Sequence, residues 1–195
     1  MALGFTRAVF LDKDGTLVEN VPYNVDPARI RLTPGAGPGL RQLYLAGFTL
    51  AVVSNQSGVA RGYFEEHALA AVEARLRELL AAFDVPLAAF FYCPHLPGGS
   101  VPRYAVDCEC RKPKPGLLYH AASQLGVDLA SSWLVGDILD DVEAGRAAGC
   151  RTVLLDNGNE TEWVVTASRL PHHVALDLAG AAQHILAHRE AVCSR

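Results

Sequence analysis

The sequence predicts an α/β fold with a Rossmann-like, mostly parallel sheet and helices on both faces. Three observations predict it. Short apolar segments alternate along the chain with segments of helical period. The apolar segments are continuous runs, which is typical of strands buried on both faces of a parallel sheet. Polar residues gather directly after these runs, where such sheets bind ligands beyond the carboxyl ends of their strands.

Five short apolar runs are the predicted strands. Their sequences are AVFL, FTLAVV, AAFFY, WLV and TVLL, at residues 8–11, 48–53, 88–92, 133–135 and 152–155. Their length and unbroken apolar character favour strands over helices. We expect all five to lie in one sheet.

Helices are predicted between these runs, at residues 39–46, 65–83, 116–126 and 140–148, with a last helix near 177–188. The second has the clearest pattern, because its apolar residues recur every three or four positions, as on the buried face of an amphipathic helix. These residues are Leu69, Val72, Leu76, Leu79 and Phe83.

The composition predicts one domain over residues 1–195, with half of its residues hydrophobic and 19% charged. A net charge of −4 gives no support for binding nucleic acid or an anionic membrane. No apolar run approaches the ~20 residues of a membrane span. We therefore expect a cytoplasmic protein with a small-molecule partner, no nucleic acid and no membrane.

Four predicted strands end in polar segments. The first runs into DKDGT at residues 12–16, the second into SNQSG at 54–58, the third into a Cys/His segment and the fourth into GDILDD at 136–141. A single polar turn is unremarkable in a loop, since Asp, Asn, Ser and Gly are common turn residues. Four consecutive strand ends with such residues predict one shared site.

Asp12 and Asp14 flank Lys13 at the first strand end, so both carboxylates can reach the same crevice. One would serve as a nucleophile and the other as a general acid and base. Two close carboxylates also favour Mg²⁺, which takes oxygen ligands from few protein groups. The structural alternative is a solvated turn.

The later strand ends add a phosphate-binding set. Asp137 directly follows the fourth strand and is the expected metal ligand, whereas Asp140 and Asp141 also fit the capped first turn of a helix. Ser54 offers a hydroxyl for phosphate oxygens, or is a plain turn serine. Arg111 and Lys112 supply positive charge in a segment that two prolines restrict.

Three cysteines and one histidine lie in a single segment, and they form the Cys₃His set of a structural zinc site. The residues are Cys93, His95, Cys108 and Cys110, in a loop at about 92–111. The total of five cysteines is odd, and a reducing compartment disfavours disulfides. We therefore expect Zn²⁺ to rigidify this loop.

These residues together resemble the haloacid-dehalogenase-like (HAD-like) phosphatase superfamily. DKDGT matches its first signature, Ser54 the second, Lys112 the third and GDILDD the fourth. The segments SNQSGVARGYF, YCPHLPGGS, CECRKPKPG and VGDILDDVEAGRAAG are most similar to the heptose-bisphosphate phosphatase branch. The resemblance covers residues 7–155 and implies a monomer with no large cap domain.

The resemblance also implies roles for single residues. Asp12 attacks phosphorus, and Asp14 protonates the leaving oxygen and then activates water. Mg²⁺ is held by the Asp12 side chain, the Asp14 carbonyl and Asp137. Ser54 and Lys112 hold the transferring phosphoryl group. The resemblance implies that Arg111 helps to recognise the substrate. It implies the same role for two turns, at 20–23 with Asn20 and Tyr23, and at 55–57 with Asn55, Gln56 and Ser57.

Three departures from the branch bear on the substrate. Ile138 stands where many members carry a basic residue, Ser54 where they often carry threonine, and Val18 where a polar residue is common. Two alternatives remain at this stage. One is a histidinol-phosphate phosphatase or another small phosphomonoester phosphatase, and the other is a non-catalytic, zinc-stapled binding module whose acidic loops hold only a cation.

Overall fold

The computed structural model describes residues 6–193, with side chains described to residue 188. Its centre is a six-stranded, all-parallel sheet in the order β3-β2-β1-β4-β5-β6. The strands are β1 (Ala8–Leu11), β2 (Thr49–Asn55), β3 (Ala89–Cys93), β4 (Trp133–Gly136), β5 (Arg151–Leu155) and β6 (His173–Ala175). The five predicted strands and the parallel α/β fold are confirmed, and β6 is an addition.

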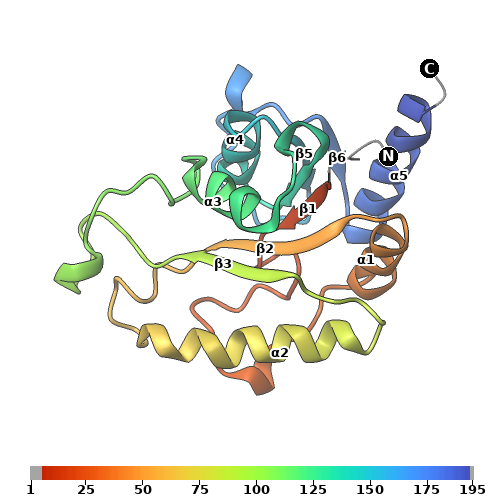
Figure 1. The fold of residues 1–195 in the computed structure, drawn as a ribbon. Helices are drawn as coiled ribbons and strands as arrows, with labels where there is room; N and C mark the ends of the chain where they lie inside the picture. Colours follow the sequence, from red (N-terminus) through yellow and green to blue (C-terminus); the bar gives the residue numbers. More distant parts are fainter. Residues whose placement is uncertain (1–5, 194–195) are drawn as a thin grey trace.

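Helices cover both faces of the sheet (Figure 1). On one side lie α1 (Ala36–Leu45), α2 (Leu69–Ala81) and α5 (Leu178–Cys193); on the other lie α3 (Gly116–Leu125) and α4 (Leu139–Ala147). Alternate residues of β1 show the division. Val9 and Leu11 join the core beneath the first group, whereas Ala8 and Phe10 join the core beneath the second. Burial on both faces explains why β1 is an unbroken apolar run.

Two helices begin three or more residues away from their predicted starts. α1 begins at Ala36, three residues early, because Pro38 falls in its first turn, where the missing N–H costs no intrahelical bond. α2 begins at Leu69 after the short 3₁₀ turn Glu66–Ala68. The last helix extends to Cys193, beyond its predicted end at 188.

Three long loops leave the carboxyl ends of strands. One joins β1 to α1 and contains the 3₁₀ turn Pro27–Arg29; a second joins β3 to α3 and contains Pro102–Tyr104; a third joins β5 to β6 and contains Ala167–Arg169. The second, which holds the Cys/His segment, reaches away from the sheet in Figure 1. A shorter turn, Leu129–Ser131, precedes β4. The candidate residues therefore lie on loops at one edge of the sheet.

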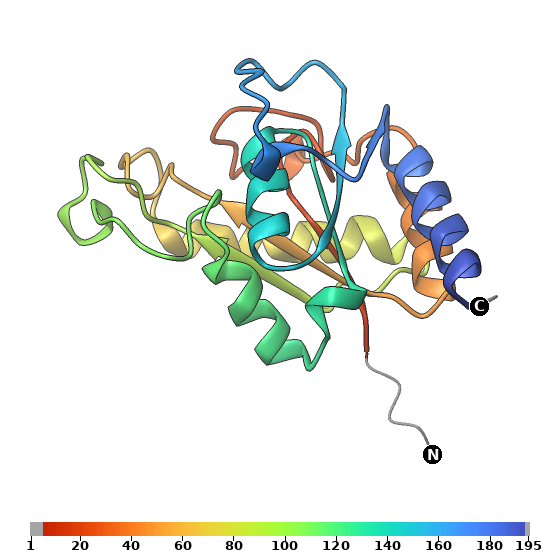
Figure 2. The same ribbon diagram turned by 90° about the horizontal axis from the view of Figure 1, so that it is seen from above.

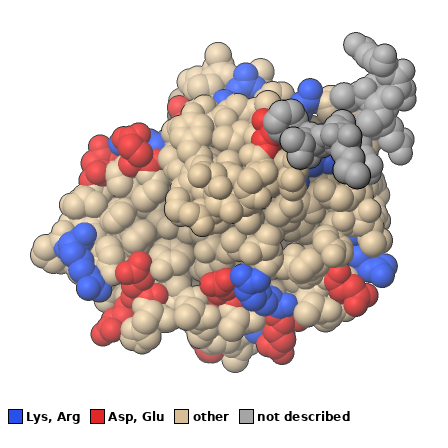
Figure 3. Space-filling model, in the orientation of Figure 1, with Lys and Arg blue, Asp and Glu red and all other residues tan. Residues whose placement is uncertain are grey.

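Charged side chains of both signs are interspersed on the face shown in Figure 3, and no continuous basic surface forms there. None of the described helices combines the length and apolarity that a membrane crossing requires.

Candidate active site and metal centres

The central position of β1 brings the acidic residues together. Its hydrogen bonding to β4 continues past the strand, where the Asp12 amide donates to the Val135 carbonyl over 2.9 Å. This contact places Asp12 beside the residues that follow β4. Asp12, Asp137 and Asp141 each offer an oxygen atom, and the three oxygens lie within 4.8 Å of one another. We call these three residues the acidic cluster.

Lys112 inserts its side chain into the acidic cluster. Its Nζ lies 2.6 Å from Asp12 Oδ1 and 2.5 Å from Asp141 Oδ1, and it donates to the Val53 carbonyl over 2.9 Å. The side chain is only 2% exposed. Burial alone would lower the pKa of Lys112, but the two carboxylates reverse that effect and raise it. Lys112 is therefore a fixed positive charge at the site.

The acidic cluster still carries more negative than positive charge. Burial, followed by repulsion from Asp12 and Asp141, raises the pKa of Asp137 to about 7. One oxygen of Asp137 accepts a hydrogen bond from Thr16 Oγ1 over 2.9 Å. A hard divalent ion binds clustered, desolvated carboxylates, and here the carboxylates outnumber the one ammonium group among them. The residues therefore fit Mg²⁺.

Asp14 lies beside this cluster with partners of its own. Its carboxylate contacts the buried ammonium of Lys13 at 2.5 Å and accepts a bond from Gln56 Nε2 over 3.3 Å. Desolvation raises the pKa of Asp14 and outweighs the opposing effect of Lys13. A raised pKa suits a carboxyl group that must first donate a proton.

The end of β2 supplies Ser54 and its neighbours. Gln56 Nε2 also donates to the buried Ser54 hydroxyl over 2.9 Å, so this amide links Ser54 to Asp14. The Asn55 side chain exchanges two hydrogen bonds with the backbone of Lys112, at 3.0 and 3.1 Å. It therefore fixes the position of Lys112. Ser57 begins the next turn, where its carbonyl accepts from the Arg61 amide.

Asn20 and Tyr23 lie further out on the loop that follows β1. Asn20 is exposed and donates to Asn159. Tyr23 has a φ of 54°, an uncommon value for a bulky residue. Its ring makes an edge contact with Tyr63 at 4.8 Å between centroids, and the guanidinium carbon of Arg61 lies 5.8 Å from the Tyr23 ring centroid. Tyr23 therefore contacts the turn that follows β2, whereas Asn20 contacts the loop that follows β5.

The four predicted zinc ligands converge. The three sulfur atoms are separated by 3.0 to 3.5 Å, and His95 Nδ1 lies 3.7 Å from Cys93 Sγ and 3.4 Å from Cys110 Sγ. All three cysteines are free thiols. In a tetrahedral site with Zn–S bonds of about 2.3 Å, neighbouring sulfur atoms lie about 3.8 Å apart. The spacing is slightly tighter than this value, and the donor set fits zinc.

The Cys/His segment is joined to the acidic cluster through the backbone. Cys93 pairs with Asn55 in the β2–β3 register, and Cys110 immediately precedes Arg111 and Lys112. Arg111 donates to the His95 carbonyl over 3.2 Å. Ordering of the Cys/His segment therefore orders both basic residues.

Several residues with contacts in this site were not among the predicted functional residues, and three of them are instructive. Asp141 was explained as a helix cap, and its carboxylate does accept from the Ile138 amide at 3.4 Å while also binding Lys112. Lys13 lies between the two predicted catalytic aspartates, and its ammonium contacts Asp14. Asn159 lies in a loop with no recognisable motif, and it contacts Asp137. The signal that could have indicated a shared site was the position of Asp141 in GDILDD, the polar segment that follows β4.

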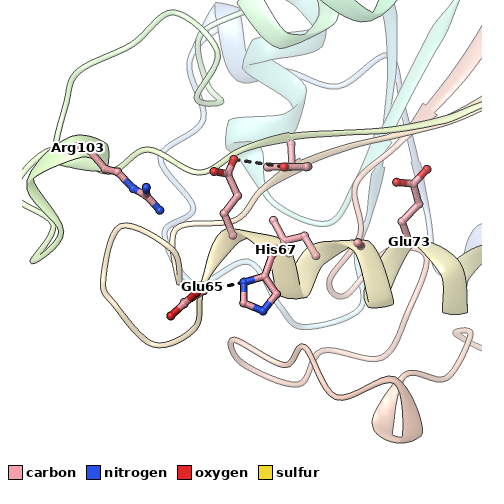
Figure 4. Close-up of a pocket in the computed structure, with 8 residues that line it drawn as sticks. Glu65, His67, Glu73 and Arg103 are labelled. Atoms are coloured by element: carbon pink, nitrogen blue, oxygen red, sulfur yellow. Dashed lines mark hydrogen bonds and ion pairs between the residues drawn. The ribbon is translucent and has the colours of Figure 1, made fainter.

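A separate hollow of about 450 Å³ lies beside the start of α2 (Figure 4). Glu65 pairs there with His67 at 3.1 Å, and Glu66 accepts from the hydroxyls of Tyr92 and Tyr104. Its lining contains none of the predicted catalytic residues. Glu66 instead links β3 to the Cys/His loop.

This chain is similar in sequence to a family model and to several known phosphatases. A family model described as HAD-hydrolase-like matches residues 109–181. D-glycero-β-D-manno-heptose-1,7-bisphosphate 7-phosphatase of Escherichia coli K12 is 39% identical over 169 residues, which cover 82% of this chain and 88% of that protein. The Pseudomonas aeruginosa PAO1 protein of the same name is 40% identical over 77% of this chain and 81% of its own length.

A solved structure is also similar. D,D-heptose 1,7-bisphosphate phosphatase from B. bronchiseptica, complexed with magnesium and phosphate, superposes with a TM-score of 0.78 at 32% identity. The match covers 94% of this chain and 99% of that one.

Proposed function

This chain belongs to the HAD-like phosphatase family, and we propose that it hydrolyses D-glycero-D-manno-heptose 1,7-bisphosphate to the 1-phosphate. The observation that carries the proposal is the buried contact of Lys112 with Asp12 inside the acidic cluster. A nucleophilic carboxylate, a fixed cation and further carboxylates for a metal are what phosphoryl transfer requires. Family membership sets aside the non-catalytic binding module.

Mg²⁺ would be held by the Asp12 side chain, the Asp14 carbonyl and Asp137. When bound, it supplies positive charge against the phosphate oxygens. Asp141 has a different role in this proposal, because its carboxylate is engaged with Lys112. It balances and orients that lysine.

Asp12 attacks the phosphorus atom, and the bond between phosphorus and the sugar oxygen breaks as the new Asp12–phosphorus bond forms. Asp14 gives its proton to the departing sugar oxygen. The ionised Asp14 then takes a proton from a water molecule, whose oxygen attacks the aspartyl-phosphate. Inorganic phosphate leaves, and both aspartates return to their starting states.

Lys112 and Ser54 would hold the oxygens of the transferring phosphoryl group, where their charge and hydrogen bonds offset the growing negative charge. Arg111, Asn20, Tyr23 and the turn at 55–57 would contact the rest of the substrate. Asn55 has the additional task of holding the Lys112 backbone.

Zn²⁺ is proposed to bind Cys93, His95, Cys108 and Cys110 as a structural ion. The loop from about 92 to 111 has few buried apolar residues of its own, so a metal would replace a core that it lacks. We further propose one domain over residues 1–195 that acts as a cytoplasmic monomer. A reducing compartment would keep the three thiols available.

A second candidate substrate is histidinol phosphate, which one observation favours. Beside Ile138, the first amide of α4 at Leu139 donates to Glu160 over 2.6 Å. An anionic side chain thus occupies a helix N-terminus that would otherwise attract a second phosphate. A substrate with one phosphate group would not need that position.

Phosphate release distinguishes these possibilities. Zinc-loaded protein with Mg²⁺ is compared on the two anomers of heptose 1,7-bisphosphate and on histidinol phosphate. The proposal predicts the highest kcat/KM for a heptose bisphosphate. A higher kcat/KM for histidinol phosphate would identify that compound as the better substrate. Absence of turnover with every phosphomonoester tested would contradict the proposed phosphatase activity.

A further inference from the structure

The loop that follows β5 contacts three parts of the active site through its first residues. Asn157 Nδ2 donates to the Gly15 carbonyl over 2.7 Å, and Asn159 Nδ2 and Asp137 Oδ2 both lie against Gly15. Glu160 accepts from the first amide of α4. Figure 2 shows this loop, in light blue, beside the loop that follows β1. It therefore closes one side of the acidic cluster.

Asn159 has a partner at each end of its amide. Its carbonyl oxygen accepts from Asn20 Nδ2 over 3.3 Å, which leaves its NH₂ group free to face Asp137 Oδ2 beside Gly15. Asn20 is one of the residues proposed to contact the substrate, whereas Asp137 belongs to the acidic cluster. One side chain thus joins the two regions.

Gly15 provides the room for this arrangement. Its φ is 81°, and a Cβ atom there would overlap both Asp137 Oδ2 and Asn159 Nδ2. The two side chains therefore lie against the same stretch of backbone. Because Thr16 holds the other oxygen of Asp137, the carboxylate is fixed from both sides.

We propose that Asn159 is a positioning residue that orients Asp137 for Mg²⁺ and separately holds Asn20 in place toward the substrate. This inference rests on the proposed function and extends it. Hydrogen bonds to a ligating carboxylate fix its orientation, and their loss typically weakens metal affinity or activity by about 10- to 100-fold. Loss of the Asn20 contact alone would leave the metal site intact.

The test compares Asn159→Ala and Asn20→Ala with wild type, with Glu162→Gln as a control on an exposed residue of the same loop. Calorimetric titration of the zinc-loaded proteins with Mg²⁺ gives the metal Kd independently of turnover. Steady-state kinetics with heptose 1,7-bisphosphate give kcat and KM. Thermal unfolding checks that each variant is folded.

Asn159→Ala is expected to raise the Mg²⁺ Kd by about 10-fold or more and to raise KM as well. Asn20→Ala is expected to raise KM with the Mg²⁺ Kd unchanged. A wild-type Mg²⁺ Kd in folded Asn159→Ala would overturn the inference, as would an equal rise in Kd in Asn20→Ala. If the proposed function is wrong, wild type will show no turnover of heptose 1,7-bisphosphate. The Mg²⁺ titration would then still decide whether Asn159 orients Asp137 for the metal.

Discussion

Lys112 places its ammonium 2.6 Å from Oδ1 of Asp12, although the two residues are 100 positions apart in the chain. The contact joins the end of β1 to the loop that carries the predicted zinc ligands. Asn55 holds the Lys112 backbone in place, and Asp141 holds the other side of its ammonium. The structure therefore builds its central cation–carboxylate contact from four separate parts of the chain.

Replacement of Lys112 by alanine should disable the site and destabilise the fold. Removal of one partner from a buried ion pair typically costs about 3–5 kcal/mol, and loss of one donor to a developing anion lowers kcat about 100-fold or more. Urea unfolding and kcat measure the two effects. The control is Lys114→Ala, because Lys114 forms only exposed ion pairs with Asp107 and Glu109. Wild-type kcat in Lys112→Ala would contradict the assigned role.

Replacement of Cys108 by serine should remove the zinc ion and weaken the loop that positions Arg111 and Lys112. Metal analysis should find about one zinc per wild-type chain and almost none in the variant. The melting temperature and kcat should fall together, because the basic residues lose their anchor. Cys150→Ala is the matched control, since Cys150 is buried outside the Cys₃His set. Full zinc occupancy in Cys108→Ser would refute the ligand assignment.

Replacement of Ile138 by lysine should favour a substrate with two phosphates. A partly exposed charge contributes up to about 1 kcal/mol, so we expect KM for heptose 1,7-bisphosphate to fall by up to about 5-fold. KM for histidinol phosphate should stay unchanged. Glu160 will compete for the new cation, and Ile138→Lys combined with Glu160→Gln should show the larger effect. Equal changes for both substrates would argue against a second phosphate near α4.

Acidification should weaken the attachment of α5 to the sheet. His184 stacks on His173 with ring centroids 3.6 Å apart, and both His184 and His188 make edge contacts with Trp133. Burial, followed by the nearby His173, His188 and Arg151, lowers the pKa of His184 below its usual 6.5. Because the unfolded chain then binds more protons, stability is lost as pH falls below about 6.5.

The measurement is the melting temperature of wild type and His184→Phe between pH 8 and pH 5. Phenylalanine keeps an aromatic ring against Trp133 but cannot be protonated. The variant should therefore lose less stability on acidification than wild type. The same pH slope in both proteins would show that His184 does not contribute.

Much of the fold was predictable because each central strand is buried on both faces and therefore reads as a continuous apolar run. β6 was not predicted, since it is a three-residue edge strand, HVA, in which only Ala175 is buried. α1 begins three residues before its predicted start, because Pro38 occupies a first turn that tolerates proline.

The site was predictable where chemistry falls at a strand end. Asp12, Ser54 and Asp137 each follow an apolar run, and a parallel sheet brings such positions to one edge. The second function of Asp141 was hidden, because helix capping already explained an aspartate at that position. Asn159 lies after β5 in a segment whose contacts depend on how the loop folds back, which local sequence does not specify.

The most direct test of the central claim is phosphate release from heptose 1,7-bisphosphate by wild type and Asp12→Asn, with Mg²⁺ and product identification by ³¹P NMR. The claim predicts that wild type yields heptose 1-phosphate and inorganic phosphate. Asp12→Asn should remain folded and yield neither, because the amide cannot form the aspartyl-phosphate. Turnover that persists in Asp12→Asn would contradict Asp12 as the nucleophile.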